Sequence, residues 1–285
     1  MTTTDTERSI DMQDLTLVIG ATGKTGRRVV ERLRARGWPV RVGSRSGQPP
    51  FDWEDPTTWE SALDGAAAAY VSYYPDVAVP GAREAVGALA ELAVANGTRR
   101  LVLLSGRGEA EAQLTEEALK TSGAEWTIVR CSWFMQNFSE GYLLDPVLTG
   151  EIALPVGETP EPFVDAEDIA DVAVAALSHD RHLGQSYELT GPRALTFAQA
   201  TEEIAQACGR PVSLTPVPMD AYAAAAAEDG VPADVLAVLR YLFTEVLDGR
   251  NADLTDGVQR ALGREPRDFR DFARLAAANG VWNPA

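Results

Sequence analysis

The sequence of 285 residues has few of the residue types that build metal sites and disulfide frameworks. Its two cysteines, Cys131 and Cys208, suggest neither a disulfide framework nor a cysteine metal cluster. The two histidines, His179 and His182, share one polar segment, which we interpret as a solvated loop. No apolar run is long enough to span a membrane. We therefore expect a protein without a metal site, a disulfide framework or a membrane-spanning segment.

Lysine is equally scarce, and this excludes a common catalytic dyad. Lys24 and Lys120 are the two lysines, and neither follows a tyrosine by four residues. Many dehydrogenases use Tyr-x-x-x-Lys, in which the lysine lowers the pKa of the tyrosine for proton transfer. A G-x-S-x-G hydrolase elbow is also lacking. Any reaction must then depend on a cofactor, with the protein supplying orientation.

Positive charge is in short supply, and the formal net charge is −17. This balance argues against nucleic acid or an anionic membrane as a partner. It suits a cationic small molecule, although acidic surfaces more often serve solubility. The first residues are polar without an apolar core, so we expect a disordered tail over residues 1–13 and no signal peptide. We expect a cytoplasmic monomer or homodimer that binds a small-molecule substrate.

The stretch from residue 15 to residue 37 combines a strand, a glycine-rich turn and a helix. An apolar run at 15–19 predicts a buried strand, and residues 27–36 carry apolar side chains on one helical face up to Gly37. Between them, Gly20 permits a sharp turn, Gly23 leaves room for a pyrophosphate, and Gly26 permits close packing. Such framing makes a glycine triplet a strong dinucleotide-binding signal. The predicted cofactor-binding residues here are Gly20, Thr22, Gly23, Lys24, Thr25 and Gly26.

The same turn also resembles the end of a P-loop, G-x-x-x-x-G-K-[ST]. That motif needs a glycine where this chain has Val18, inside the predicted strand. No later strand ends in an aspartate placed to hold magnesium. We therefore exclude a nucleoside triphosphatase.

The second predicted strand, residues 39–44, decides the type of dinucleotide. An NAD-specific site usually has an acidic residue at this tip to bind the ribose 2′-hydroxyl. Here Ser44, Arg45 and Ser46 offer a cation and two hydroxyls, which suit a 2′-phosphate, and Lys24 can reach the same group. The alternative is an ordinary basic loop. We predict NADPH as the cofactor.

Strands and helices alternate along the chain, which predicts a Rossmann-type, doubly wound parallel α/β sheet. Further strands are expected at 66–72, 100–105, 126–130 and 186–190, and Asp52 is expected near the adenine at the end of a third strand. Residues at the strand ends face the cofactor crevice in such a fold. They add the cofactor candidates Asp52, Ser72, Tyr73, Ser105 and Cys131, and Cys131 either faces the cofactor or fills space.

The residues after Cys131 are rich in aromatic side chains. Such residues line small-molecule pockets and ordinary cores alike. The candidate substrate-binding residues are Trp133, Phe134, Asn137 and Phe163. The candidates for supplying or relaying a proton are Tyr73, Tyr74, Ser105 and Tyr142, although Tyr73 and Tyr74 are equally packing aromatics. Asp165 is expected to cap a helix, with Asp168 at its third position.

We predict two domains after the tail. Residues 14–192 form the NAD(P)-binding domain, with an insert for the substrate at about 132–164. Residues 193–285 form a smaller substrate-binding lobe, expected to be helical from Leu195 onward. Its helices are expected at 198–208, 218–228, 232–247 and 268–278.

Three segments resemble the NmrA-like family of atypical short-chain dehydrogenases: GATGKTG at 20–26, RCSWFMQNFS at 130–139 and PFVDAEDIA at 162–170. Residues 44–46, 51–53, 190–192 and 263–269 (GREPRDF) resemble its ergot-alkaloid branch, the festuclavine and agroclavine dehydrogenases. The resemblance implies NADPH-dependent reduction of an imine or iminium carbon without a tyrosine–lysine dyad. Cys131 departs from the family, which commonly has proline there.

Two functions remain open, with a third ranked last. The first is an NADPH-dependent reductase of a small C=N, C=C or C=O compound, which includes quinones. Hydride delivery to an iminium carbon needs no proton donor, so position and electrostatics can suffice. The second is a redox sensor, since some NmrA-like proteins bind the dinucleotide and regulate a partner without turnover. A sugar-nucleotide epimerase or dehydratase normally needs the missing tyrosine–lysine pair.

Overall fold

The structure, a computed structural model, describes residues 14–283, so the tail predicted over residues 1–13 lies outside the described residues. The described chain divides into two compact units. The first unit comprises residues 14–130, 169–187 and 260–263, and the second comprises 131–168, 188–259 and 264–283. The sequence-based division at residue 193 stays a prediction. No helix in the described part of the chain is long and apolar enough to cross a membrane.

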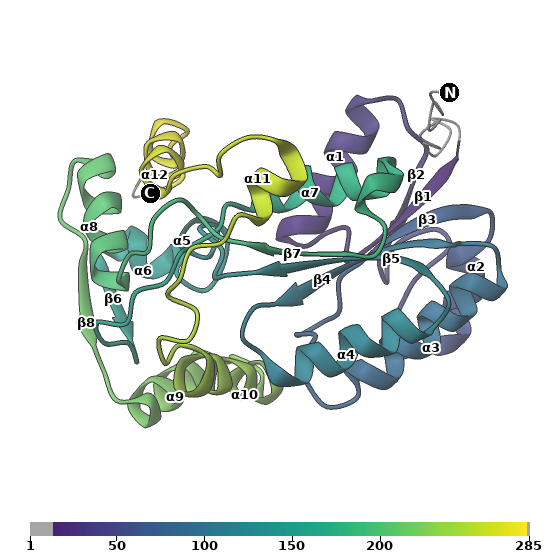
Figure 1. Ribbon diagram of the computed structural model, residues 1–285. Helices are drawn as coiled ribbons and strands as arrows, with labels where there is room; N and C mark the ends of the chain where they lie inside the picture. The colour runs from purple at the N-terminus through teal and green to yellow at the C-terminus, as the bar shows by residue number, and fades with distance from the viewer. Residues whose placement is uncertain (1–13, 284–285) are drawn as a thin grey trace. The chain divides into compact units, whose positions relative to one another are not determined.

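The main sheet has six strands in the order β2-β1-β3-β4-β5-β7 (Figure 1). β1 pairs in parallel with β2 and with β3, and β3 pairs in parallel with β4. The order confirms the predicted Rossmann-type α/β class, in which the chain first builds outward on one side of β1 and then on the other. The strands are β1 (Leu15–Ile19), β2 (Val40–Gly43), β3 (Ala66–Val71), β4 (Arg100–Gly106), β5 (Glu125–Cys131) and β7 (Gln185–Leu189).

Helices cover both faces of this sheet. In Figure 1, α3 and α4 lie on one face, and α1 and α7 lie on the other. Arg32 of α1 forms an ion pair of 2.6 Å with Asp171 of α7. α1 begins at Lys24, earlier than the predicted start, because Gly23 is already its N-cap. The helices are α1 (Lys24–Ala35), α2 (Trp59–Leu63, after a 3₁₀ turn at Pro56–Thr58), α3 (Ala82–Ala95), α4 (Ala110–Thr121) and α7 (Ala166–Ser178), with a 3₁₀ turn at Asp180–His182.

The third strand predicted to end near Asp52 is wrong. Residues 51–55 instead form a turn with an isolated bridge between Asp52 and Asp55. The Trp59 indole donates a hydrogen bond of 2.7 Å to the Asp52 carbonyl, and the Phe51 and Trp53 rings meet edge to face with centroids 5.1 Å apart. Aromatic side chains favour strands, but here they pack this turn onto α2.

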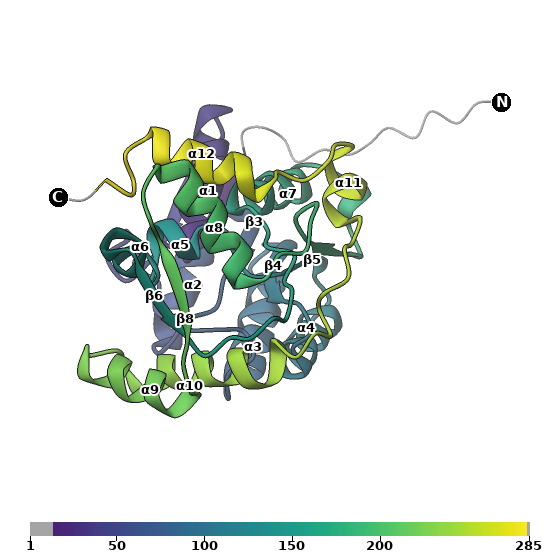
Figure 2. The same ribbon diagram turned by 90° about the vertical axis from the view of Figure 1, so that its left-hand side faces the viewer.

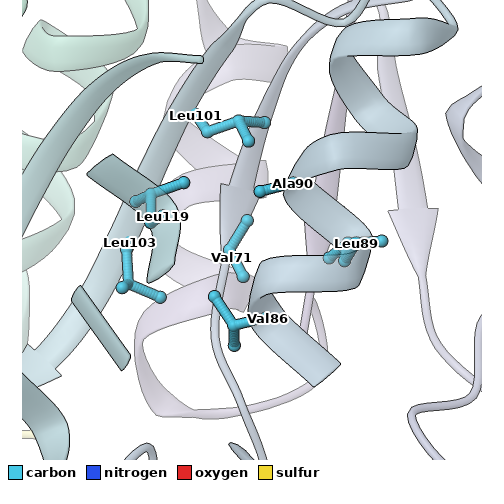
Figure 3. A pocket seen from close by; sticks show the side chains of 7 residues that line it. All are labelled: Val71, Val86, Leu89, Ala90, Leu101, Leu103 and Leu119. Carbon is cyan, nitrogen blue, oxygen red and sulfur yellow. The ribbon is translucent and has the colours of Figure 1, made fainter. Parts of the chain in front are cut away.

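Small aliphatic side chains fill the core of the first unit between the sheet and the α3–α4 pair. Figure 3 shows part of it, where side chains from β3, β4, α3 and α4 point toward one another. The gap among them has no space for a water molecule. Continuous apolar strands of this kind are expected in a parallel sheet buried on both faces. The side chains are Val71, Val86, Leu89, Ala90, Leu101, Leu103 and Leu119.

The second unit contains a small parallel pair of strands as well as helices. β6 and β8 lie side by side, and α8 packs beside α12 (Figure 2). The expectation of a wholly helical chain after Leu195 is therefore wrong at β8. Pro216 and Pro218 disfavour helix there, because a residue before proline is pushed to extended conformations.

The short elements of this later part complete the described fold. A π-helical segment, Leu242–Val246, follows α10. The remaining elements are α5 (Asn137–Glu140), α6 (Leu144–Thr149), β6 (Glu151–Leu154), α8 (Phe197–Cys208), β8 (Ser213–Pro216), α9 (Met219–Glu228), α10 (Ala233–Tyr241), α11 (Gly257–Leu262) and α12 (Phe269–Ala278).

Candidate functional site

The glycine turn between β1 and α1 is very tightly packed. Gly20 has a φ of +73°, which favours glycine, and its carbonyl accepts a hydrogen bond of 2.9 Å from the Gly23 amide. A Cβ added to Gly26 would lie 2.2 Å from the Gly20 carbonyl oxygen, so α1 can approach β1 only through glycine. Gly23 is exposed, and a Cβ added to it would lie 3.3 Å from the Gly20 carbonyl oxygen. This is the backbone geometry that a pyrophosphate requires.

The first turn of α1 leaves its N-terminus suited to an anion. It contains no acidic residue, so no side chain neutralises the positive end of the helix dipole. The Thr25 side chain is buried, and its hydroxyl accepts a hydrogen bond of 2.9 Å from the Tyr70 hydroxyl. Thr25 would therefore meet a phosphate through its backbone amide. Thr22 is exposed and Lys24 is half-buried beside it.

The tip of β2 lies directly beside this turn, because the Gly20 amide donates to the Gly43 carbonyl at 3.1 Å. The hydroxyls of Ser44 and Ser46 are 3.5 Å apart, and the Ser44 carbonyl accepts hydrogen bonds from two amides that fix the loop. Arg45 is exposed and forms no hydrogen bond or ion pair with the described residues. The residues predicted to bind a 2′-phosphate therefore lie beside the turn predicted to bind the pyrophosphate.

Asp52 is fixed within its own loop. Its carboxylate accepts a hydrogen bond of 3.1 Å from the Glu54 amide. The loop reaches the end of β3 through the Trp53 indole, which donates to the Ser72 carbonyl at 3.1 Å. Ser72 in turn faces the glycine turn, since a Cβ on Gly20 would lie 3.0 Å from its Cβ. A role for Asp52 at the adenine stays a prediction.

The two tyrosines after β3 differ in their surroundings. Tyr73 packs against Trp53 with ring centroids 4.7 Å apart, and burial, followed by Glu54 and Glu84, raises its pKa. Tyr74 is 67% exposed. The packing interpretation therefore fits Tyr73, whereas Tyr74 has no aromatic partner among the described residues.

Ser105, at the end of β4, is bound to a buried acid. Its hydroxyl donates a hydrogen bond of 2.7 Å to Glu116, which is fully buried. Arg130 binds the same carboxylate through two nitrogens at 2.8 and 2.6 Å. The Ser105 hydrogen is therefore held by Glu116, and its oxygen remains able to accept. Cys131 follows Arg130, and burial raises the pKa of its thiol, which favours the space-filling interpretation.

The predicted substrate-binding residues fall into two groups. Trp133 and Phe163 belong to the aromatic core of the second unit, where each ring contacts Phe197 at 5.4 and 5.0 Å respectively. Phe134 and Asn137 are half-buried, and the Asn137 amide donates to the Phe134 carbonyl at 3.0 Å. The contacts favour a core role for the first pair, and a substrate contact for the second pair stays a prediction.

Tyr142, the last of the predicted proton donors, also lies in the second unit. Part of its surface is exposed, yet burial and the neighbouring Tyr222 raise its pKa well above the usual value. A phenol with a raised pKa keeps its proton more firmly, so Tyr142 is a weaker acid than an ordinary tyrosine.

Asp165 caps α7 as predicted, but Asp168 has a larger role than the sequence suggested. The Asp165 carboxylate accepts hydrogen bonds from the Glu167 amide at 2.8 Å and from the Gln136 amide group at 2.7 Å. Asp168 is fully buried and forms ion pairs with Arg264, at 2.7 Å, and with Arg267. The two arginines belong to the GREPRDF segment. The sequence analysis named this segment for its family resemblance and assigned it no interaction partner.

Comparison with known proteins agrees with this architecture. The NmrA-like family matches residues 111–273. The NAD(P)H azoreductase of Xenophilus azovorans is 30% identical over 283 residues, covering 92% of this chain and 98% of the relative. Agroclavine dehydrogenase of Claviceps fusiformis is 30% identical over 284 residues, covering 93% and 98%. The structure of Citrobacter sp. triphenylmethane reductase complexed with NADP(H) has a TM-score of 0.72 at 17% identity, covering 92% of this chain and 99% of the other, which shows a shared fold.

Proposed function

Because this chain belongs to the NmrA-like family, we propose that it is an NADPH-dependent reductase of a small organic compound. Its substrate would carry a C=N, C=C or C=O bond. Two relatives that match nearly the whole chain support this proposal, since one is named an azoreductase and the other a dehydrogenase. The reduced dinucleotide supplies the hydride when it is bound.

One observation carries the cofactor assignment. The glycine turn with its exposed α1 N-terminus lies beside a strand tip that presents Arg45 between two serines and no acidic residue. The turn would hold the pyrophosphate through backbone amides. The tip would hold a 2′-phosphate through a charge-assisted hydrogen bond, which an acidic residue would repel. The residues present therefore fit NADPH better than NADH.

NADPH oxidation by the purified protein tests the activity. The panel contains an iminium salt, a cyclic imine, an enone, a quinone and an aldehyde, and cofactor binding is measured by calorimetry in parallel. We expect turnover with one class of bond. Tight NADPH binding without turnover on any member would contradict the reductase and favour a regulatory role.

Arg45→Ala tests the preference for NADPH. Loss of a hydrogen bond to a charged group costs about 1.5–3 kcal/mol, so the Kd for NADPH should rise about 10- to 100-fold. The Kd for NADH should stay nearly unchanged. Arg36→Ala is the matched control, because Arg36 is an exposed arginine at the opposite end of α1. Equal weakening of both cofactors by Arg45→Ala would contradict the assignment.

A further inference from the structure

Two acidic side chains meet at one edge of the main sheet in the first unit. Asp76 follows β3, and Glu109 follows β4. These neighbouring strands are parallel, so their carboxyl ends lie at the same edge. The two side chains are hydrogen-bonded to each other. Thr115 of α4 donates a hydrogen bond of 3.0 Å to the Val77 carbonyl and so fixes the Asp76 segment against the helix that Glu109 begins.

The Glu109 side chain does not cap the helix that it begins. It is the N-cap of α4, yet its side chain makes no capping hydrogen bond. It is only 5% exposed, and its Oε2 has no hydrogen-bond partner among the described residues. Its Oε1 lies over the end of β4, where a Cβ on Gly106 would be 1.7 Å away. The carboxyl group is turned from its helix toward the strand ends.

The surroundings hold a proton on this pair. Two carboxyl groups in contact cannot readily both ionise. Burial, then the charge of Asp76 and the hydrogen bond to it, raise the pKa of Glu109 to about 9. Burial also raises the pKa of Asp76. Of the adjoining charged residues, Arg107 is buried and Glu111 is exposed.

We propose that Glu109 is the proton donor of the reductase and that Asp76 holds that proton in place. This inference rests on the proposed function. The hydride and its electron pair reach the substrate carbon from the cofactor, while the Glu109 O–H bond breaks and its proton goes to the substrate heteroatom or neighbouring carbon. Glu109 is left as a carboxylate and takes a proton from solvent before the next turnover.

The position of the pair agrees with this role. A dinucleotide in a doubly wound sheet crosses the point where the strand order reverses, here between β1 and β3. The proposed 2′-phosphate contact at β2 assigns the adenosine half to that side, which leaves the β3 and β4 ends for the nicotinamide half. Of the polar groups there, Ser105 donates its hydrogen to Glu116, whereas Oε2 of Glu109 has no hydrogen-bond partner among the described residues.

Turnover of Glu109→Gln on two substrate classes tests the proposal. Reduction of an enone needs a proton, and reduction of an iminium salt needs none. General acid catalysis contributes about 10²- to 10⁴-fold, so kcat on the enone should fall by at least about 100-fold. The rate on the iminium salt should fall much less than the rate on the enone. Both rates should stay within about twofold of wild type in Glu111→Gln, the exposed control.

Infrared titration of the unliganded protein gives a readout that does not depend on turnover. We expect a protonated carboxyl band at neutral pH that disappears near pH 9 and is missing in Glu109→Gln. Asp76→Asn, which keeps Glu109, should move that disappearance to lower pH because one negative charge is removed. Absence of the band at neutral pH, or equal enone turnover by Glu109→Gln and wild type, would overturn the proton role. Absence of wild-type turnover on every substrate would instead contradict the proposed function.

Discussion

Each unit of the molecule buries an acidic side chain, but the two acids have opposite neighbours. In the second unit, Asp168 is fully buried between Arg264 and Arg267, and it also accepts a hydrogen bond of 2.7 Å from the Arg267 amide. In the first unit, Glu109 is buried against Asp76, another acid. The charge of Asp168 is compensated by cations, whereas Glu109 is neutralised by a proton.

This difference separates a structural acid from a chemically useful one. A buried charge is costly unless it is paired, and a group without a counter-ion shifts its pKa instead. The arginines bound to Asp168 come from the segment before α12, so its charge is compensated within the second unit. The proton on Glu109 can be transferred. Burial alone therefore does not identify a functional acid. The charge of the neighbouring side chain does.

Asp168→Asn should have the largest effect on stability. The amide cannot compensate two guanidinium groups, and breaking a buried ion pair costs about 3–5 kcal/mol. The free energy of unfolding from denaturant titration measures this loss. Asp220→Asn is the control, because Asp220 is 91% exposed in its pair with Arg240 and such pairs contribute about 0–1 kcal/mol. Similar losses in the two variants would remove the contrast between buried and exposed pairs.

Glu109 should make the stability depend on pH in the opposite direction to a paired carboxylate. Its pKa is raised in the folded protein from 4.5 to about 9, so the folded state holds the proton more tightly. The stabilisation is fully present below pH 4.5 and is lost as the pH rises toward about 9.

Glu109→Gln removes this dependence and keeps the shape of the protonated acid. The unfolding free energy of the wild type should therefore fall relative to the variant by up to about 1.4 kcal/mol per pH unit within that interval. Denaturant titrations at several pH values between 5 and 9 measure the difference. Parallel curves for the two proteins would mean that Glu109 titrates normally.

The first unit could be predicted well from the sequence because its signals are local. A strand buried on both faces reads as an unbroken apolar run, and β1 lies at the predicted residues 15–19. The glycine turn could also be predicted, because each glycine is required by the backbone geometry of a few neighbouring residues. The third strand expected to end at Asp52 does not form, because the aromatic side chains there pack a turn.

The second unit was harder because its short elements depend on distant partners. β8 has four residues, which are mostly exposed, and it exists through pairing with β6. The ion pairs of Asp168 join residues almost a hundred positions apart, and no pattern in the sequence links Asp76 to Glu109. Such pairs are set by topology, so the candidate cofactor residues could be predicted and the proton-holding pair could not.

Ser105→Ala should have the smallest effect on stability and turnover. It tests a case between Asp168 and Glu109. Glu116 is a buried acid that is bound by both an arginine and a hydroxyl. Removal of the hydroxyl should cost about 0.5–1.5 kcal/mol of unfolding free energy, because Arg130 still compensates the carboxylate. Turnover on the enone should fall by less than about tenfold, since Ser105 gives its hydrogen to Glu116 and not to a ligand. A loss as large as that in Glu109→Gln would transfer the proton role from Glu109 to Ser105, and the sign of an acid's neighbour would no longer mark the donor.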